Sequence, residues 1–190
     1  MRIAQIERKT RETDISVDLN LDGTGTSSID IPSAFLSHML TALSTHSCID
    51  LTIRAEGDLQ HHVVEDVAIV FGMALRQAIG DGIGIRRFGA ATVPMDCSLA
   101  RVIVDLVERP YSVIDIDLQR ESIEDLASEE ILHFLESLVA SGRFNLHALV
   151  EYGTNDHHKV EAVFKALALA LRSALVIENQ DIPSSKGVLR

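Results

Sequence analysis

A histidine doublet followed by a glutamate occurs twice in this chain, and these residues are the ones best suited to chemistry. The copies are His61-His62-Val63-Val64-Glu65 and His157-His158-Lys159-Val160-Glu161. In an α-helix the first histidine and the glutamate of each copy lie one turn apart on one face, where both can bind the same metal ion. Adjacent histidines point about 100° apart, so the two members of a doublet suit two different ions. The pattern predicts a site for divalent metal ions.

The likeness between the two copies extends well beyond the doublets. Residues 67–78 align with residues 163–174, and His38 and His133 precede their doublets by nearly the same number of residues. We interpret the chain as a duplicated unit of roughly 95 residues, with a first half at 1–83 and a second at 84–190 that form one compact catalytic unit. If the histidines were only surface residues at helix ends, there would be no reason for the doublet, its glutamate and the upstream histidine to occur twice.

The elements that must position these residues follow from hydrophobic periodicity. In the first half we predict strands at 14–21 and 28–31 joined as a hairpin, a helix opening at Pro32-Ser33 that carries His38 and His46, a strand at 49–55 and a helix from 61 to 79. After the glycine-rich break at 80–84 we predict strands at 87–93, 100–106 and 113–118. A helix capped by Ser128 then carries His133 to about 142, followed by a strand at 144–152 and a helix from 157 to 176. This order predicts an α+β fold of two similar halves, each a mostly antiparallel sheet with helices packed on one face.

Composition limits the classes of function. With 190 residues, 46% of them hydrophobic, the chain is long enough for a full core. A net charge of −11 opposes nonspecific binding to nucleic acid. The chain has neither an apolar run of membrane-spanning length nor a signal-peptide core at its start, so we expect a cytoplasmic protein without membrane partners. Cys48 and Cys97 lack metal-ligand spacing, and we expect free thiols that serve packing.

The motifs, taken together and in order, resemble those of the imidazoleglycerol-phosphate dehydratase family. Besides the doublets they include Phe35-Leu36-x-His38, Gly84-Ile85-x-Arg87-Phe88-Gly89, Val93-Pro94-Met95-Asp96, Arg109-Pro110-Tyr111 and Pro183-Ser184-x-Lys186-Gly187. The resemblance covers nearly the whole chain. It implies a hydro-lyase of histidine biosynthesis that converts imidazoleglycerol phosphate to imidazoleacetol phosphate.

The resemblance also implies the cofactor, the assembly and the metal ligands. It implies two divalent ions per site, most simply Mn²⁺, and a homo-oligomer of 24 subunits with metal sites at subunit interfaces. The implied ligands are His38, His61, His62, Glu65, His133, His157, His158 and Glu161. How they divide between the two ions is open.

Proton transfer and phosphate binding need further groups, which the resemblance places as follows. The residues for acid and base catalysis are Glu161, Glu12, His46 and Asp96, with the acid and the base not distinguished. The residues for the substrate phosphate are Arg87, Arg109, Lys165, Ser184 and Lys186, since arginine offers bidentate geometry to phosphate oxygens.

The chain departs from the family pattern at four places. The link before His61 is short, Ser37 and Ala42 replace polar residues of the first helix, and Val107-Glu108 replaces Ser-Gly before Arg109. None of these removes an implied metal ligand, but each bears on activity or phosphate affinity. Two alternatives stay open at this point: a dinuclear metalloenzyme with another substrate, and a noncatalytic protein in which metals only hold subunits together.

Overall fold

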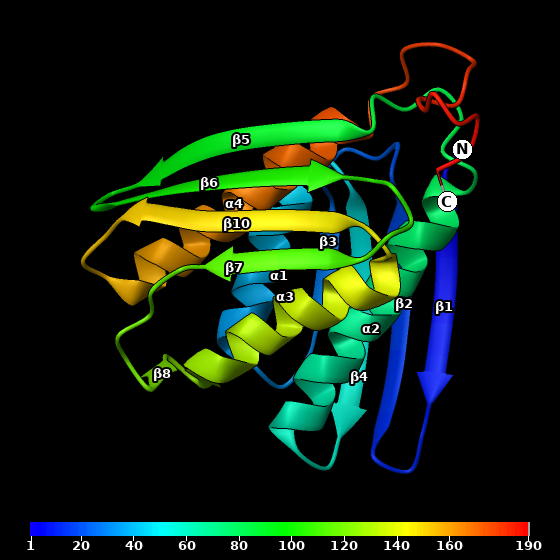
Figure 1. The fold of residues 1–190 in the computed structure, drawn as a ribbon. Helices are drawn as coiled ribbons and strands as arrows, with labels where there is room; N and C mark the ends of the chain where they lie inside the picture. Colours follow the sequence, from blue (N-terminus) through cyan, green and yellow to red (C-terminus); the bar gives the residue numbers. More distant parts are fainter. Residues whose placement is uncertain (190) are drawn as a thin grey trace.

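Two four-stranded sheets with the same strand order form the framework of the computed structural model, which describes residues 1–189 (Figure 1). The first half contains β1 (Ile3–Lys9), β2 (Thr13–Asn20), β3 (Ser27–Asp30), α1 (Ala34–Ser47), β4 (Asp50–Gly57) and α2 (Gln60–Ile79), with sheet order β1-β2-β4-β3. The second contains β5 (Phe88–Met95), β6 (Ser98–Asp105), β7 (Tyr111–Asp115), the short β8 (Ser122–Ile123) and β9 (Leu126–Ala127), α3 (Ser128–Gly142), β10 (Asn145–Tyr152) and α4 (Asp156–Ala174), with sheet order β5-β6-β10-β7. The matching orders confirm the predicted α+β fold of two similar halves. The division at residue 83 stays a prediction.

The helices of one half pack against those of the other. Helix α1 contacts α4, and α2 contacts α3, while α2 also covers β1 and β2 and α4 covers β5 and β6. Figure 1 shows the helices gathered on one face of each sheet. The metal-ligand candidates of the two halves therefore lie on helices that face one another.

The predicted hairpin between residues 14–21 and 28–31 is wrong. Strand β3 pairs in parallel with β4, from Ser27 opposite Leu51 to Asp30 opposite Arg54. The antiparallel neighbours of β2 are β4 and a strand that the prediction omitted, β1. The Asp50 carboxylate accepts hydrogen bonds from the backbone N–H of Thr24, Gly25 and Thr26 at 2.8–3.1 Å, which holds the connecting loop beside β4. The turn residues therefore carry the chain across the sheet rather than back along β2.

Helix starts follow the predicted capping chemistry in one case and differ in another. Ser33 caps α1, with its hydroxyl oxygen accepting the N–H of Leu36 at 3.2 Å, as predicted. The predicted cap Ser128 is instead the first residue of α3, and its hydroxyl donates to the carbonyl of Arg120. The Glu130 carboxylate accepts the N–H of Ala127 at 3.2 Å and so satisfies the helix start in its place.

Close approach of two helices requires glycine at the α2–α3 crossing. A Cβ atom added at Gly72 would lie 2.2 Å from Ser141 Oγ and 2.7 Å from the backbone nitrogen of Gly142. Around this crossing the core is filled by large buried side chains such as Phe71 and Phe134, and the ring of Phe134 contacts that of Phe164 at 5.8 Å. Among the described residues no helix combines the length and apolar character needed to cross a membrane.

Candidate metal centre

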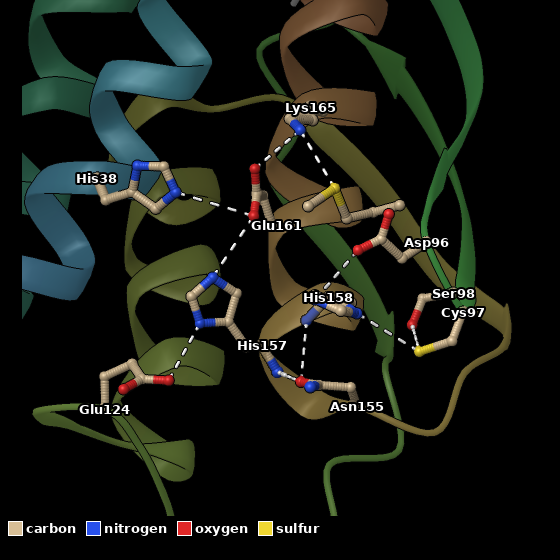
Figure 2. A network of polar contacts seen from close by, with 11 residues as sticks. His38, Asp96, Cys97, Ser98, Glu124, Asn155, His157, His158, Glu161 and Lys165 are labelled. Carbon is tan, nitrogen blue, oxygen red and sulfur yellow. Dashed lines mark hydrogen bonds and ion pairs between the residues drawn. The ribbon is translucent and has the colours of Figure 1, made fainter.

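Three of the predicted ligands come together where α1 meets α4. His38 of α1 and His157 and Glu161 of α4 offer donor atoms that all lie within 4.8 Å of one another. The Glu161 Oε2 atom lies 3.5 Å from His157 Nε2 and 3.8 Å from His38 Nε2 (Figure 2). We call this set group A. It combines one residue of the first half with two of the second.

A second set forms where α2 meets α3. His61 and Glu65 of α2 and His133 of α3 also have donor atoms within 4.8 Å of one another, and we call this set group B. Glu65 Oε1 lies 3.3 Å from His133 Nε2, and the rings of His61 and His133 stack with centroids 5.3 Å apart. Group B thus reverses the arrangement of group A, with two residues from the first half and one from the second. All six residues of the two groups were predicted as metal ligands from the sequence, but their division into these two sets was not predicted.

The two remaining ligand candidates, His62 and His158, face away from these groups. Within the doublets the ring centroids lie 6.1 and 6.0 Å apart, and neither His62 nor His158 contributes a donor atom to group A or group B. His62 Nδ1 lies 2.8 Å from Asp58 Oδ1, and His158 Nδ1 lies 3.5 Å from Cys97 Sγ. We call His62 and His158 the outward histidines.

The start of α4 is held by a cap and by a buried ion pair. The Asn155 side chain accepts the N–H groups of His157 and His158 at 2.9 and 3.4 Å. One residue on, Asp156 pairs with Lys159 at 3.0 Å, both side chains being less than 5% exposed. The cap and the ion pair together hold the first turn of α4, which contains the second doublet.

The Glu161 carboxylate is kept in its charged form. Burial raises its pKa, but the hydrogen bond and charge of Lys165 and the charges of His38 and His157 outweigh burial, and the net pKa is lowered. Lys165 Nζ lies 2.8 Å from Glu161 Oε1, on the oxygen that does not face the histidines (Figure 2). A carboxylate that is ionised and oriented in this way is suited to bind a cation.

The other residues predicted for acid and base catalysis are placed differently from one another. Glu12, between β1 and β2, has its Oε2 atom 4.0 Å from His62 Nδ1, and Asp96, between β5 and β6, has its Oδ2 atom 3.5 Å from His158 Nε2. The two carboxylates therefore come from corresponding turns of the two halves, but Glu12 faces Nδ1 of its histidine and Asp96 faces Nε2. His46 lies in the last turn of α1, roughly 12 Å along the helix from His38, and joins neither group A nor group B.

Most of the predicted phosphate-binding residues lie at the far end of α4 from group A. The backbone N–H of Arg87 donates to the carbonyl of Ala174, and its side chain donates to the carbonyl of Pro183, next to Ser184. Its guanidinium also binds the Asp105 carboxylate through two hydrogen bonds of 2.6 and 2.9 Å. Arg109, in the loop before β7, and Lys186, in the tail, are exposed. Lys165 lies apart from these residues, beside Glu161.

Sequence reasoning missed three partners of the doublets. Glu124 Oε1 lies 3.1 Å from His157 Nδ1 and comes from the turn between β8 and β9, for which no local pattern gave a signal. Cys97, expected to serve packing, contacts His158. Asp58 precedes His62 by four residues but lies in the link before α2, outside the predicted helix, so the helical spacing rule was not applied to it.

The departures from the family pattern lead to specific contacts. Ser37 donates to the Ile29 carbonyl at 3.4 Å, and Ala42 is buried. Glu108 adopts a left-handed backbone with φ of 43°, which glycine adopts more readily, and its carboxylate lies 3.3 Å from Arg76 Nε. The carboxylate of Glu108 is thus held by Arg76 of α2.

The fold and site define a class: a duplicated α+β protein in which helices of both halves bring together two sets of imidazole and carboxylate donors. The family model for imidazoleglycerol-phosphate dehydratase matches residues 32–171. A dehydratase of this name from Chlorobium luteolum is 52% identical over 99% of this chain and 96% of its own, and one from Methanothermobacter thermautotrophicus is 50% identical over 100% and 98%. The crystal structure of the Staphylococcus aureus dehydratase superposes with a TM-score of 0.85 at 36% identity, covering 92% of this chain and 99% of that one. The structure of the Pyrococcus furiosus enzyme, in complex with (S)-C348, gives 0.86 at 37%, covering 96% and 99%. The chain belongs to the imidazoleglycerol-phosphate dehydratase family, which confirms the family inferred from the sequence.

Proposed function

We propose that this protein is a metal-dependent hydro-lyase that converts imidazoleglycerol phosphate to imidazoleacetol phosphate in histidine biosynthesis. The observation that carries the proposal is the pairing of groups A and B. Each is assembled from both halves of the chain, and each contains two imidazoles and one carboxylate. Membership in the dehydratase family over nearly the full length supports the same reaction.

The donor set fits divalent cations. Imidazole nitrogen together with carboxylate oxygen suits ions such as Mn²⁺ and Zn²⁺, and we propose two Mn²⁺ per site. The ligands would be the residues of groups A and B, with His62 and His158 completing the coordination. When bound, such an ion acts as a Lewis acid that stabilises negative charge developing on the substrate imidazole.

The protein's own carboxylates are placed to move protons. The reaction removes the hydroxyl from the carbon beside the imidazole ring and a proton from the next carbon, and the resulting enol becomes the ketone, so it needs an acid for the departing hydroxyl and a base for the C–H proton. Glu12 and Asp96 each lie beside one of the outward histidines, and Glu161 lies within group A. We propose these three residues, with His46 as a fourth, for the two proton transfers.

Phosphate binding requires a second subunit. Helix α4 rises about 1.5 Å per residue, so Glu161 and Ala174 are roughly 20 Å apart, and Arg87 is bound at the Ala174 end. One small phosphorylated imidazole does not reach from group A to Arg87, Ser184 and Lys186 of the same chain. We therefore propose that Arg87, Arg109, Ser184 and Lys186 serve the metal centre of a neighbouring subunit, with Lys165 acting beside Glu161.

The direction of the outward histidines supports the same assembly. His62 and His158 point away from groups A and B, as ligands shared with a neighbouring copy would. We propose a homo-oligomer of 24 subunits with metal sites at the interfaces. We further propose that the enzyme works in the cytoplasm.

The test is turnover of imidazoleglycerol phosphate by the purified protein loaded with Mn²⁺. The double variant His61→Ala, His158→Ala should lose activity, because it removes ligands from both doublets. His147→Ala is the matched control, since His147 lies on β10 and its ring contacts Tyr111. The proposal is wrong if the wild-type protein turns over none of this substrate, or if the double variant stays as active as the control.

A further inference from the structure

The Nδ1 atoms of the doublet histidines share a feature that groups A and B do not explain. Three of the four meet a side chain of a different element or loop: His62 meets Asp58, His157 meets Glu124 and His158 meets Cys97. Histidines that bind metals usually donate a hydrogen bond from the N–H of their other ring nitrogen to such a partner, which sets both the tautomer and the ring orientation. In all three residues Nε2 is therefore the ring nitrogen placed to bind a cation, and the Nε2 atoms of His157 and His158 each face a carboxylate oxygen at 3.5 Å, of Glu161 and Asp96 respectively.

The partner of His62 exists because the link between β4 and α2 is short. Only Asp58 and Leu59 separate Gly57 from Gln60, so Asp58 lies one turn before His62. The backbone N–H of Asp58 donates to the Glu12 carbonyl at 3.0 Å, which fixes where its carboxylate lies. The longer link that the family pattern implies would place a different residue at this distance from His62.

The partner of His158 comes from a different part of the second half. Cys97 lies in the turn between β5 and β6, after Asp96, whose backbone φ is 45°. Its thiol contacts His158 Nδ1 at 3.5 Å and Ser98 Oγ at 3.6 Å (Figure 2). The residue four positions before His158 is Thr154, where the first doublet has Asp58, and Thr154 hydrogen-bonds to the Cys97 thiol. The turn between β5 and β6 thus places a partner beside Nδ1 of His158, as the short link between β4 and α2 places one beside Nδ1 of His62.

We propose that Asp58 and Cys97 are positioning residues that hold the two outward histidines through Nδ1 and direct Nε2 toward a shared metal ion. This inference rests on the proposed metal role of His62 and His158. It gives the two histidines chemically different partners, a carboxylate and a thiol. Loss of either partner should weaken the binding of the ion that its histidine coordinates and leave the binding of the other ions unchanged.

The test is Mn²⁺ binding to the metal-free, assembled protein, measured by titration calorimetry without substrate. Loss of a partner to a metal-binding histidine typically weakens metal affinity by about 10–100-fold. In Asp58→Ala and in Cys97→Ala we expect this loss of affinity at one of the metal sites and unchanged affinity at the other. Asp58→Asn and Cys97→Ser keep an acceptor for the Nδ1 proton, so they should recover most of the affinity.

Matched controls separate this effect from general damage. Asp18→Ala removes an exposed carboxylate on β2, and Cys48→Ser removes the other thiol; both should bind Mn²⁺ as the wild type does. Gel filtration and thermal melts check that each variant assembles and folds. Alanine variants that bind Mn²⁺ like the wild type overturn the inference and leave the proposed function standing. A wild-type protein that binds no Mn²⁺ overturns both.

Discussion

Replacing Asp156 by asparagine should destabilise the protein strongly, because it leaves a buried cation without its counter-charge. Lys159 is 4% exposed, and its ammonium contacts Asp156 Oδ1 at 3.0 Å and the Asp117 carbonyl at 2.6 Å. The Asp156 carboxylate also accepts the backbone N–H groups of Gln119 and Arg120, each at 2.8 Å. An asparagine side chain keeps one acceptor oxygen but neutralises none of the lysine charge.

The expected magnitude follows from this geometry. Removing one partner of a buried ion pair costs about 3–5 kcal/mol. For a chain of this length 1 kcal/mol shifts the melting temperature by about 2–4 °C, so Asp156→Asn should melt roughly 6–20 °C below the wild type. The double variant Asp156→Asn, Lys159→Met removes both charges and should recover much of the loss.

The same pair predicts how stability depends on pH. Burial raises the pKa of Asp156, but the hydrogen bonds from Arg120, Lys159 and Gln119 lower it by more than burial raises it. The net shift of the pKa is therefore downward. A lowered pKa in the folded state gives stability that is present above the ordinary aspartate pKa of about 3.9. That stability is lost as the pH falls through the folded pKa.

Scanning calorimetry at one fixed protein concentration is the assay, since assembly also affects the melting temperature. Melting of Asp156→Asn within about 2 °C of the wild type would refute the reasoning. So would a double variant less stable than Asp156→Asn alone.

Three further outcomes follow. Gly72→Ala should lower the free energy of unfolding by about 1–3 kcal/mol, because its methyl group has no room against α3; urea unfolding checks this, and an unchanged midpoint contradicts it. Hydrogen bonds from Thr154 and, to a smaller extent, from His158 lower the pKa of Cys97 to about 6. In the metal-free Cys48→Ser variant, where Cys97 is the remaining thiol, the rate at which an alkylating reagent modifies Cys97 should therefore rise as the pH passes through 6. A rate that reaches half its maximum only above pH 8 would count against this. Chelation of Mn²⁺ should lower the melting temperature, since an ion at 100 times its Kd stabilises by about 2.7 kcal/mol; equal melting with and without chelator argues against metal binding by the folded state.

Most of the metal-ligand candidates could be predicted from the repeated motifs. The doublets, their glutamates and the upstream histidines follow helical spacing, and helical spacing alone determines which residues share a face. The pairs His61 with Glu65 and His157 with Glu161 therefore followed from the sequence, whereas the contact of each pair with a histidine of the other half did not. The outward direction of His62 and His158 followed from the same geometry.

What sequence reasoning missed depends on contacts between distant elements. The pairing of β3 with β4 is set by hydrogen bonds between Asp50 and a loop more than twenty residues earlier, and period-two patterns say nothing of strand order. Glu124 and Cys97 reach the doublets from turns whose backbone direction only the tertiary fold determines. The ion pair of Arg87 with Asp105 likewise joins adjacent strand ends that no local spacing rule connects.

Anomalous scattering from crystals grown with Mn²⁺ would show whether groups A and B bind metal ions. Data recorded at the manganese absorption edge locate each ion independently of the protein coordinates. We expect two peaks per chain, one against His38, His157 and Glu161 and one against His61, Glu65 and His133. Crystals of the loaded protein with no peak at either group would contradict this expectation.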